Sequence, residues 1–249
     1  KNLVDKIWIR KKNNVRNKFY KLPEKCVGES YKSKIDKVVS KLKRYGGDYH
    51  FVTASENNSW LLNIRGSDSK YTPIPHSYIL IDKKEKITVF CDLKKVSNLL
   101  KKEFKKIKFI DINFTSEFLA KINKKKFIVD KNSCSIDFEN IISQKNKILN
   151  KDDCIYYLKS IKAKKEIENI KKAHIYDGVA LTKYLFWLKK NYIKEKITEI
   201  SAEQKLLNFR KKNKSFKFLS FPTISGTGPN GAIIHYKATK KSNRRLRRG

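Results

Sequence analysis

Methionine is absent from the 249 residues of this chain, and acidic residues are scarce beside basic ones. A natural full-length chain starts with methionine, so we expect that Lys1 is not the encoded start. No run approaches the roughly 18 uncharged apolar residues that a membrane helix needs. The opening stretch KNLVDKIWIRKK is charged throughout and lacks the apolar core of a signal peptide. We therefore expect no membrane partner.

Cysteine and histidine are also rare, with four residues of each. They are Cys26, Cys91, Cys134 and Cys154, and His50, His76, His174 and His235. No CxxC, HExxH or His-x-His motif occurs, and no dense cysteine pattern suggests a disulfide framework. The sequence thus predicts free thiols in a reducing cytoplasm. It predicts no metal site built from ligands that neighbour one another in the sequence.

Charge of one sign dominates: 59 Lys and Arg face 24 Asp and Glu, a formal net charge of +35. Such an excess raises nucleic acid as a partner. However, the excess is mostly Lys and is spread along the chain, whereas a phosphate-tracking groove needs Arg and aromatic residues interleaved on one element. The densest basic run is residues 237–249. Three interpretations of it stay open: an arm that binds nucleic acid, a solvated loop, or a segment whose continuation is missing.

The first part of the chain alternates between strand-like and helix-like segments. From residue 30 to 45, the apolar positions recur at three- and four-residue steps, which predicts an amphipathic helix that Gly46 and Gly47 stop. A second helix is predicted with Ser55 as its cap and Gly66 as its stop. Further helices are predicted over 93–104, 115–122 and 133–149, and strands over 50–54, 77–82, 86–92, 107–112 and 126–130. This alternation, with 12% aromatic residues, predicts a folded α/β layer domain.

The second part of the chain begins near residues 155–160, where the pattern changes. It predicts a long helix over about 163–190 and a second helix from Thr198, with Glu199 in its first turn at the positive end of the helix dipole. Two strand-like runs follow, over 216–221 and 232–236.

The loop PTISGTGPNG joins these two runs and carries three glycines within six residues. Glycines permit positive φ and close backbone approach. A phosphate loop is disfavoured because no Gly-Lys-Ser/Thr and no helical run follows. His235 lies at the end of the apolar run that follows this loop. This position is compatible with a structural role and with a functional role about equally well.

Spaced words in the sequence resemble one known family. They are KAKKEIENIKKAHIYDGVAL, WL, TEI, FR, LSFPTISGTGPNGAIIHY and SNRRL over about 161–246, and WLLNIRGSD at 60–68. They resemble the Xaa-Pro aminopeptidases (aminopeptidase P), the proline-specific branch of the pita-bread metallopeptidases, in their long, three-domain form. The resemblance is loose over 75–158 and weak before Ser30.

The resemblance implies a hydrolase that removes an N-terminal residue when proline follows it. In that family, two divalent metal ions, usually Mn²⁺, are held by two Asp, one His and two Glu and activate a bridging water. The family residue that matches His235 lies beside the metals and hydrogen-bonds the bound peptide, so we expect His235 to bind substrate. His174 matches no ligand, and Asp177 is expected to pack on its helix.

The resemblance also implies a domain organisation. Residues 1–28 would be a remnant of the first domain and its linker. Residues 29–155 would form a creatinase/prolidase N-terminal-like α/β middle domain. Residues 160–249 would form the incomplete first part of the pita-bread catalytic domain. Such a remainder would leave helix faces and strand edges uncovered, so we expect a folded middle domain and a poorly protected second part.

The family's metal-ligand positions would follow residue 249, and Asp68, Asp82 and Asp92 belong to the middle domain and cannot replace them. We therefore expect a fragment that binds no metal pair and is inactive alone. Two alternatives stay open: a non-catalytic basic module that binds nucleic acid or an acidic partner, and one half of a split enzyme completed by a second, C-terminal chain. A homodimer is a further implication of the resemblance.

Overall fold

The computed structural model describes residues 3–7 and 17–247. Lys1 and the last two residues of the basic C-terminal run lie outside the described residues. The chain divides into two compact units, Lys1–Ala163 (unit 1) and Lys164–Gly249 (unit 2). Each unit is described by itself.

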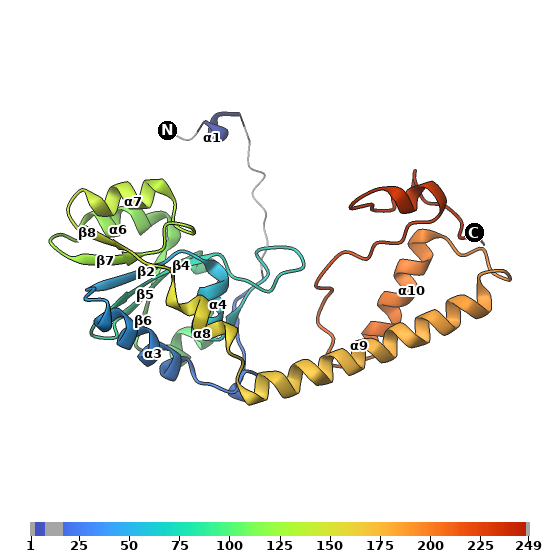
Figure 1. Cartoon of the computed structure of the whole chain (residues 1–249), viewed down its shortest axis with the longest axis horizontal. Helices are drawn as coiled ribbons and strands as arrows, with labels where there is room; N and C mark the ends of the chain where they lie inside the picture. The colour runs from blue at the N-terminus through green and yellow to red at the C-terminus, as the bar shows by residue number, and fades with distance from the viewer. Residues whose placement is uncertain (1–2, 8–16, 248–249) are drawn as a thin grey trace. The chain divides into compact units, whose positions relative to one another are not determined.

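Unit 1 is built on a six-stranded mixed sheet in the order β6-β5-β4-β2-β7-β8 (Figure 1). Its strands are β2 (Tyr49–Val52), β4 (Ser77–Asp82), β5 (Ile87–Cys91), β6 (Ile107–Asp111), β7 (Lys126–Val129) and β8 (Lys147–Asn150). The strand β4 is antiparallel to both β2 and β5. The other neighbouring pairs are parallel: β6 with β5, β7 with β2, and β8 with β7. Strands β1 (Tyr20–Lys21) and β3 (Ile64–Arg65) form a separate antiparallel pair.

Helices cover both faces of the sheet. One face packs against α3 (Tyr31–Arg44), α4 (Ser55–Leu62), α5 (Asn98–Glu103) and α8 (Cys154–Ser160), and the other against α6 (Thr115–Ala120) and α7 (Ile136–Ser143). Short helical segments occur at α1 (Val4–Ile7), α2 (Glu24–Val27), η1 (Leu93–Lys95) and η2 (Ile112–Phe114). The result is a three-layer arrangement, which confirms the α/β class that the sequence predicts.

Strand alternation explains the two cores. In β4, Ile79 and Ile81 are buried in the α3/α4 core, while Leu80 between them lies in the α6/α7 core. Side chains point alternately to the two faces of a strand, so a sheet covered on both sides needs apolar residues at consecutive positions. The helix predicted over 30–45 is confirmed as α3, and the hydroxyl of Ser30 caps it by accepting from the Ser33 amide at 3.2 Å.

Three predictions in unit 1 are wrong in part. Residues 133–149 form the short helix α7 followed by β8, because the apolar residues after α7 pair with β7 instead of continuing a helix. Ser55 does not cap α4; its hydroxyl instead bonds the backbone of Ser77, and Ala54 occupies the cap position. Asn63, in the left-handed conformation at φ 55°, ends α4 before Gly66 is reached.

Unit 2 contains two long helices, α9 (Lys164–Asn191) and α10 (Glu199–Lys211), as predicted, and the short helix η3 (Gly228–Ala232). The two long helices pack together and are joined by an ion pair from Arg210 to Asp177, with Nε to Oδ1 at 2.6 Å and Nη2 to Oδ2 at 3.1 Å. The strands predicted over 216–221 and 232–236 do not form. A strand needs a neighbouring strand to pair its backbone groups, and within the described part of unit 2 no such neighbour lies beside these runs.

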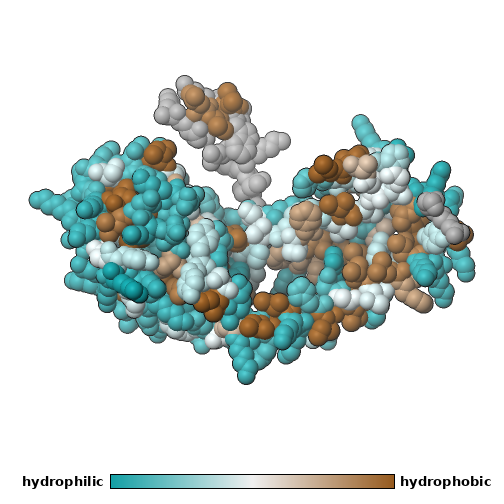
Figure 2. Space-filling model, viewed as in Figure 1, coloured by the Kyte–Doolittle hydropathy of each residue, from teal (hydrophilic) through white to brown (hydrophobic). Residues whose placement is uncertain are grey.

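Apolar side chains remain at the surface of unit 2, as Figure 2 shows along α9. On α9 they are Ile167, Ile170, Ile175, Tyr176, Val179, Leu181, Leu185 and Phe186. In the two runs predicted as strands, Phe218, Phe221, Ile233 and Ile234 are exposed. These exposures agree with the expectation that apolar helix faces of this part lie uncovered, and its poor protection stays a prediction. No helix among the described residues has the length and apolar character to cross a membrane.

Candidate functional site

The site begins with Glu199, the first residue of α10. The Thr198 hydroxyl accepts from the Ser201 amide, and the Ser201 hydroxyl accepts from the Thr198 amide, so a reciprocal capping box fixes the start of the helix. Glu199 is fully buried, at 0% exposure. A buried carboxylate is stable only when donors surround it, and the Gly-rich loop supplies them.

Four groups donate hydrogen bonds to the Glu199 carboxylate. Its Oε1 accepts from the Thr227 amide at 2.8 Å and from Asn230 Nδ2 at 3.0 Å. Its Oε2 accepts from the Tyr236 hydroxyl at 2.8 Å and from the Arg244 amide at 3.1 Å. One carboxylate thus holds both ends of the loop that carries His235.

Asn230 and Tyr236 are the other buried polar anchors of this loop. Asn230 Nδ2 also donates to the Tyr236 hydroxyl at 2.8 Å and to the Ser242 carbonyl at 2.9 Å. Both side chains are about 7% exposed. Because Tyr236 follows His235 directly, its anchoring fixes the backbone on the C-terminal side of the histidine.

The backbone of the loop needs glycine at two points. A Cβ added to Gly226 would lie 3.0 Å from the Asn230 carbonyl oxygen, so this position must stay small. Gly228 has φ 55°, in the left-handed region that favours glycine. His235 itself also has φ 55°, an uncommon conformation for a residue with a side chain. The turn therefore presents the imidazole outward, and His235 is exposed.

The segment SNRRL closes the site from the C-terminal side. The Glu199 amide donates to the Arg244 carbonyl at 3.0 Å, and the Leu246 amide donates to the Ile197 carbonyl at 2.8 Å. Thr198 and Arg245 form an antiparallel bridge between these bonds. The words TEI and SNRRL, which are far apart in the sequence, thus lie side by side.

The electrostatics of Glu199 reflect two opposing effects. Burial by itself would raise the pKa of the carboxyl. The hydrogen bonds from Thr227, Asn230, Tyr236 and Arg244 outweigh burial, so the pKa of Glu199 lies below its ordinary value of 4.5. Glu199 is therefore ionised at neutral pH and serves as a fixed acceptor for the loop.

The other residues singled out by the sequence take different places. His174 is exposed on α9, and Asp177 is the partner of Arg210. A groove of about 650 Å³ runs between α9, α10 and residues 215–224, and Asp177 and Arg210 contribute to its lining, whereas His235 does not.

The three middle-domain aspartates have structural partners. Asp68 pairs with Lys95 at 2.5 Å and accepts from the His76 amide at 2.7 Å. Asp82 accepts from the amides of the turn after β4, and Asp92 caps η1. None of these contacts resembles a metal centre.

The described residues bring one set of metal-ligating side chains together, and it lies in unit 1: His50, Asp153 and Cys154. Sequence reasoning missed it because the histidine is far from the other two in the chain. It also missed Glu199, Asn230 and Tyr236 as anchors. In the sequence, these three residues are marked only by a helix-capping pattern and by a Gly-rich loop. Neither feature indicates that the start of the helix contacts the loop.

Comparison with known proteins agrees with this architecture. Residues 10–166 match the Creatinase/Prolidase N-terminal domain, and residues 168–249 match metallopeptidase family M24. Xaa-Pro aminopeptidase 1 of Dictyostelium discoideum is 33% identical, over 100% of this chain and 41% of that protein. A probable Xaa-Pro aminopeptidase P of Leptosphaeria maculans is 32% identical, over 96% of this chain and 42% of that protein. The chain therefore spans about two fifths of the length of these relatives.

Solved structures share the fold. The X-prolyl aminopeptidase of Caenorhabditis elegans, described as a cytosolic enzyme with a di-nuclear active site, superposes with a TM-score of 0.89 at 24% identity, over 99% of this chain and 42% of that one. The prolidase of Pyrococcus horikoshii superposes with a TM-score of 0.57 at 22% identity, over 87% and 58%. The chain belongs to the family of the Creatinase/Prolidase N-terminal domain, and its residues 168–249 are similar to metallopeptidase family M24.

Proposed function

We propose that this chain forms part of an Xaa-Pro aminopeptidase, a hydrolase that removes an N-terminal residue when proline follows it. The observation that carries the proposal is the anchored loop. Glu199, Asn230 and Tyr236 hold a Gly-rich turn so that His235 faces outward. Its support comes from the family relationship and from the relatives' names, which specify cleavage before proline.

In this proposal, His235 binds the peptide substrate. Its imidazole can donate to or accept from a peptide group, and the four bonds to Glu199 keep the turn from moving when substrate arrives. A preorganised donor costs little reorganisation on binding. We assign His235 a substrate-positioning contact and assign no proton transfer to it.

Two divalent metal ions, which we propose to be Mn²⁺, would supply the activated water for attack on the scissile carbonyl. The structure of the nematode relative is described as di-nuclear. In the described part of unit 2, no three His, Cys, Asp or Glu side chains come close enough to hold an ion. Glu199 is already saturated by four donors. In this proposal the ligands of the metal pair belong to another part of the enzyme, and the chain is inactive by itself.

The compartment that we propose is the cytoplasm. Cys91, Cys134 and Cys154 are free thiols, and burial raises the pKa of each to about 12, which keeps them protonated. The partner that we propose is a second polypeptide that carries the remaining part of the M24 domain. A homodimer is the alternative assembly.

A complementation assay tests the proposal. The purified chain is incubated with Mn²⁺ and a peptide that has proline in second position, and we expect no release of the first residue. Addition of a polypeptide carrying the remaining M24 segment of the Dictyostelium relative should give release, together with a complex of the two chains on a sizing column. In this complex, His235→Asn should lower kcat/KM at least about tenfold, as loss of one hydrogen bond to substrate does.

The matched control is His174→Asn, which changes the exposed histidine on α9 and should leave kcat/KM unchanged. Robust turnover by the chain alone would contradict the proposed inactivity. A stable complex that cleaves no proline peptide would contradict the proposed activity. Equal effects of the two histidine variants on kcat/KM would contradict the proposed contact between His235 and the substrate.

A further inference from the structure

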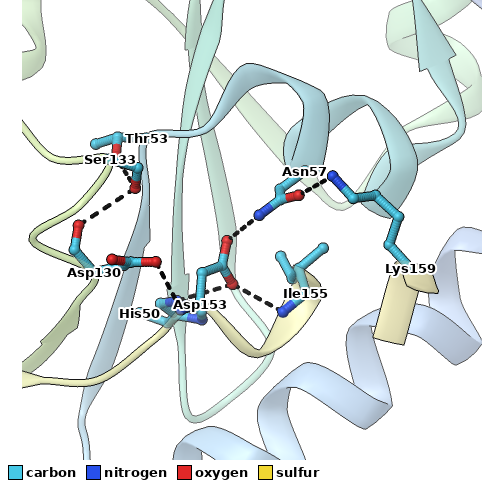
Figure 3. A network of polar contacts seen from close by, with 8 residues as sticks. All are labelled: His50, Thr53, Asn57, Asp130, Ser133, Asp153, Ile155 and Lys159. Carbon is cyan, nitrogen blue, oxygen red and sulfur yellow. Dashed lines mark hydrogen bonds and ion pairs between the residues drawn. The ribbon is translucent and has the colours of Figure 1, made fainter. Parts of the chain in front are cut away.

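A buried polar cluster lies at the junction of β2, the end of β8 and the start of α8 (Figure 3). His50 on β2 points to the same face as Val52, which belongs to the α3/α4 core. Asp153 and Cys154 lie at the N-terminus of α8, which packs on that face through Ile155. The sheet therefore brings the histidine to the aspartate and the cysteine.

The imidazole of His50 is buried, at 2% exposure, and its Nε2 makes no hydrogen bond to any of the described residues. The nearest acid, Asp153 Oδ1, lies 3.5 Å from Nε2, at the outer limit of a polar contact. A buried polar atom without a partner is costly in free energy. The Nε2 atom faces the carboxylate, so a cation bound between the two would give Nε2 a partner.

The charge around His50 favours a cation. Asp130 and Asp153 are both buried, at 5% and 3% exposure. Asp153 Oδ2 accepts from Asn57 Nδ2 at 2.6 Å, Asp153 Oδ1 accepts from the Ile155 amide at 3.0 Å, and Asp130 Oδ2 accepts from the Asp153 amide at 3.0 Å.

These donors to the two carboxylates are neutral. The ammonium group of Lys159 makes its hydrogen bond to the far side of the Asn57 amide, where it donates to Oδ1 at 2.6 Å, and it interacts with Asp153 electrostatically. Burial lowers the pKa of His50 in spite of the two carboxylates, so the imidazole supplies no positive charge at neutral pH.

The donor atoms available are one nitrogen, one oxygen and one sulfur. His50, the Asp153 carboxylate and Cys154 Sγ lie within 4.8 Å of one another. A tetrahedral zinc site holds its ligands about 2.0–2.3 Å from the ion, so the three groups need only a small closure, for which the half-buried cysteine can rotate. A mixed N/O/S set suits Zn²⁺ and its relatives better than Mg²⁺ or Mn²⁺.

We propose that His50, Asp153 and Cys154 form a binding site for a zinc-class divalent cation in unit 1. The cation would satisfy His50 Nε2, balance the buried carboxylates and replace the thiol proton of Cys154. It would tie the N-terminus of α8 to the central strand β2. Because the unfolded chain does not preassemble these ligands, binding would also stabilise unit 1.

Metal titration of the whole, chelator-treated chain tests the site. We expect Co²⁺ to bind with one equivalent and give a thiolate-to-cobalt charge-transfer band, and Zn²⁺ to displace it and raise the unfolding temperature. Cys154→Ser should abolish the band and weaken Zn²⁺ binding at least tenfold. The matched control is Cys134→Ser, because Cys134 is also partly buried, with a pKa raised like that of Cys154, but packs against the α6/α7 core.

Two further measurements keep the proposal testable if Cys154→Ser misfolds. Asp153→Asn retains a side chain able to cap α8 and should lower Zn²⁺ affinity while the far-ultraviolet circular dichroism stays unchanged. In the unaltered chain, saturating Zn²⁺ should slow alkylation of Cys154 at least tenfold and leave that of Cys134 unchanged.

Absence of a cobalt band and equal alkylation rates with and without Zn²⁺ would overturn the site and leave a plain contact between His50 and Asp153. A band that persists in Cys154→Ser would place the metal elsewhere and overturn it too. These readouts do not depend on peptidase activity, so they stand or fall separately from the proposed function.

Discussion

Each unit contains a buried charged side chain that binds several polar groups, Lys34 in unit 1 and Glu199 in unit 2. In unit 1, Lys34 is 1% exposed, and its Nζ donates to the Trp60 carbonyl at 2.9 Å and to Asn63 Oδ1 at 2.7 Å. The same ammonium lies 4.1 Å from the centre of the Trp60 ring. In unit 2, Glu199 has the corresponding role with opposite sign. Both side chains are stable in the interior because polar partners replace water.

Replacement of Lys34 by methionine should destabilise unit 1 by roughly 2–3 kcal/mol, because it leaves the Trp60 carbonyl and Asn63 Oδ1 buried without this donor. Denaturant unfolding of the whole chain measures the change. The control is Lys37→Met, which removes an exposed ion pair with Glu29 at 2.6 Å and should cost at most about 1 kcal/mol. Equal losses for the two variants would show that the Lys34 contacts carry no special weight.

Replacement of Glu199 by glutamine should release the Gly-rich loop, because the new amide group opposes two of the four donors. The pKa of Glu199 is lowered in the folded state, so its stabilising effect is present above about pH 4.5 and is lost as the pH falls through the lower, folded pKa. Hydrogen exchange at the Thr227 and Arg244 amides measures both effects.

In the unaltered chain, protection of these two amides should fall at acid pH, whereas in Glu199→Gln it should be low at every pH. Glu203→Gln, one turn along α10, is the control and should behave like the unaltered chain. Unchanged protection of the Thr227 amide in Glu199→Gln would contradict the anchoring role.

Among the elements, the loop 222–236 and the helix α9 use glycine for opposite reasons. Gly226 is required because backbone atoms crowd the position where its Cβ would lie. Gly178 lies within α9, and apart from its chain neighbours and its own helix backbone no atom of the described residues lies within 4 Å of such a Cβ. A glycine in a helix interior lowers stability relative to alanine. The same substitution should therefore have opposite effects at the two positions.

Gly226→Ala should displace Asn230 from Glu199 and lower the protection of the Thr227 amide by the equivalent of about 1 kcal/mol. Gly178→Ala should instead stabilise α9 by up to about 1 kcal/mol. Hydrogen exchange resolves the two sites in the same experiment. Increased protection of the Thr227 amide in Gly226→Ala would contradict the predicted crowding of a Cβ at position 226.

The two units differ in how many apolar side chains they bury. Unit 1 has two continuous cores on the faces of one sheet, while unit 2 buries few apolar residues and exposes many along α9. Regions with few buried contacts open at lower free energy than core strands. The net charge of +35 adds self-repulsion at low salt.

Brief trypsin digestion should therefore cut unit 2 before unit 1. The first cuts should fall in residues 212–217, which follow α10 and form no helix or strand. A fragment that contains the six-stranded sheet should persist and be identified by mass spectrometry. Early cleavage between β4 and β5, where three lysines follow Asp82 within the turn, would contradict this order of stability.

Local patterns in the sequence by themselves determined most element types and the layered α/β class. The repeat of Ile35, Val38, Val39 and Leu42 specifies α3, and the family words predict the matches to the Creatinase/Prolidase N-terminal domain and to metallopeptidase family M24. These signals are readable because helix and strand periodicities are local. The same locality explains the errors, since β8 and the unpaired runs near His235 depend on whether a neighbouring strand is present.

Only the tertiary structure decided which distant residues meet. The carboxylate of Glu199 reaches a loop 28 positions later and a backbone amide 45 positions later, and the order of the sheet places His50 beside Asp153. Neither contact has a sequence spacing that would reveal it, because the chain path between the partners, not the residues themselves, sets their distance. Burial then gives these contacts their energy, since polar groups removed from water depend on the few partners that the fold supplies.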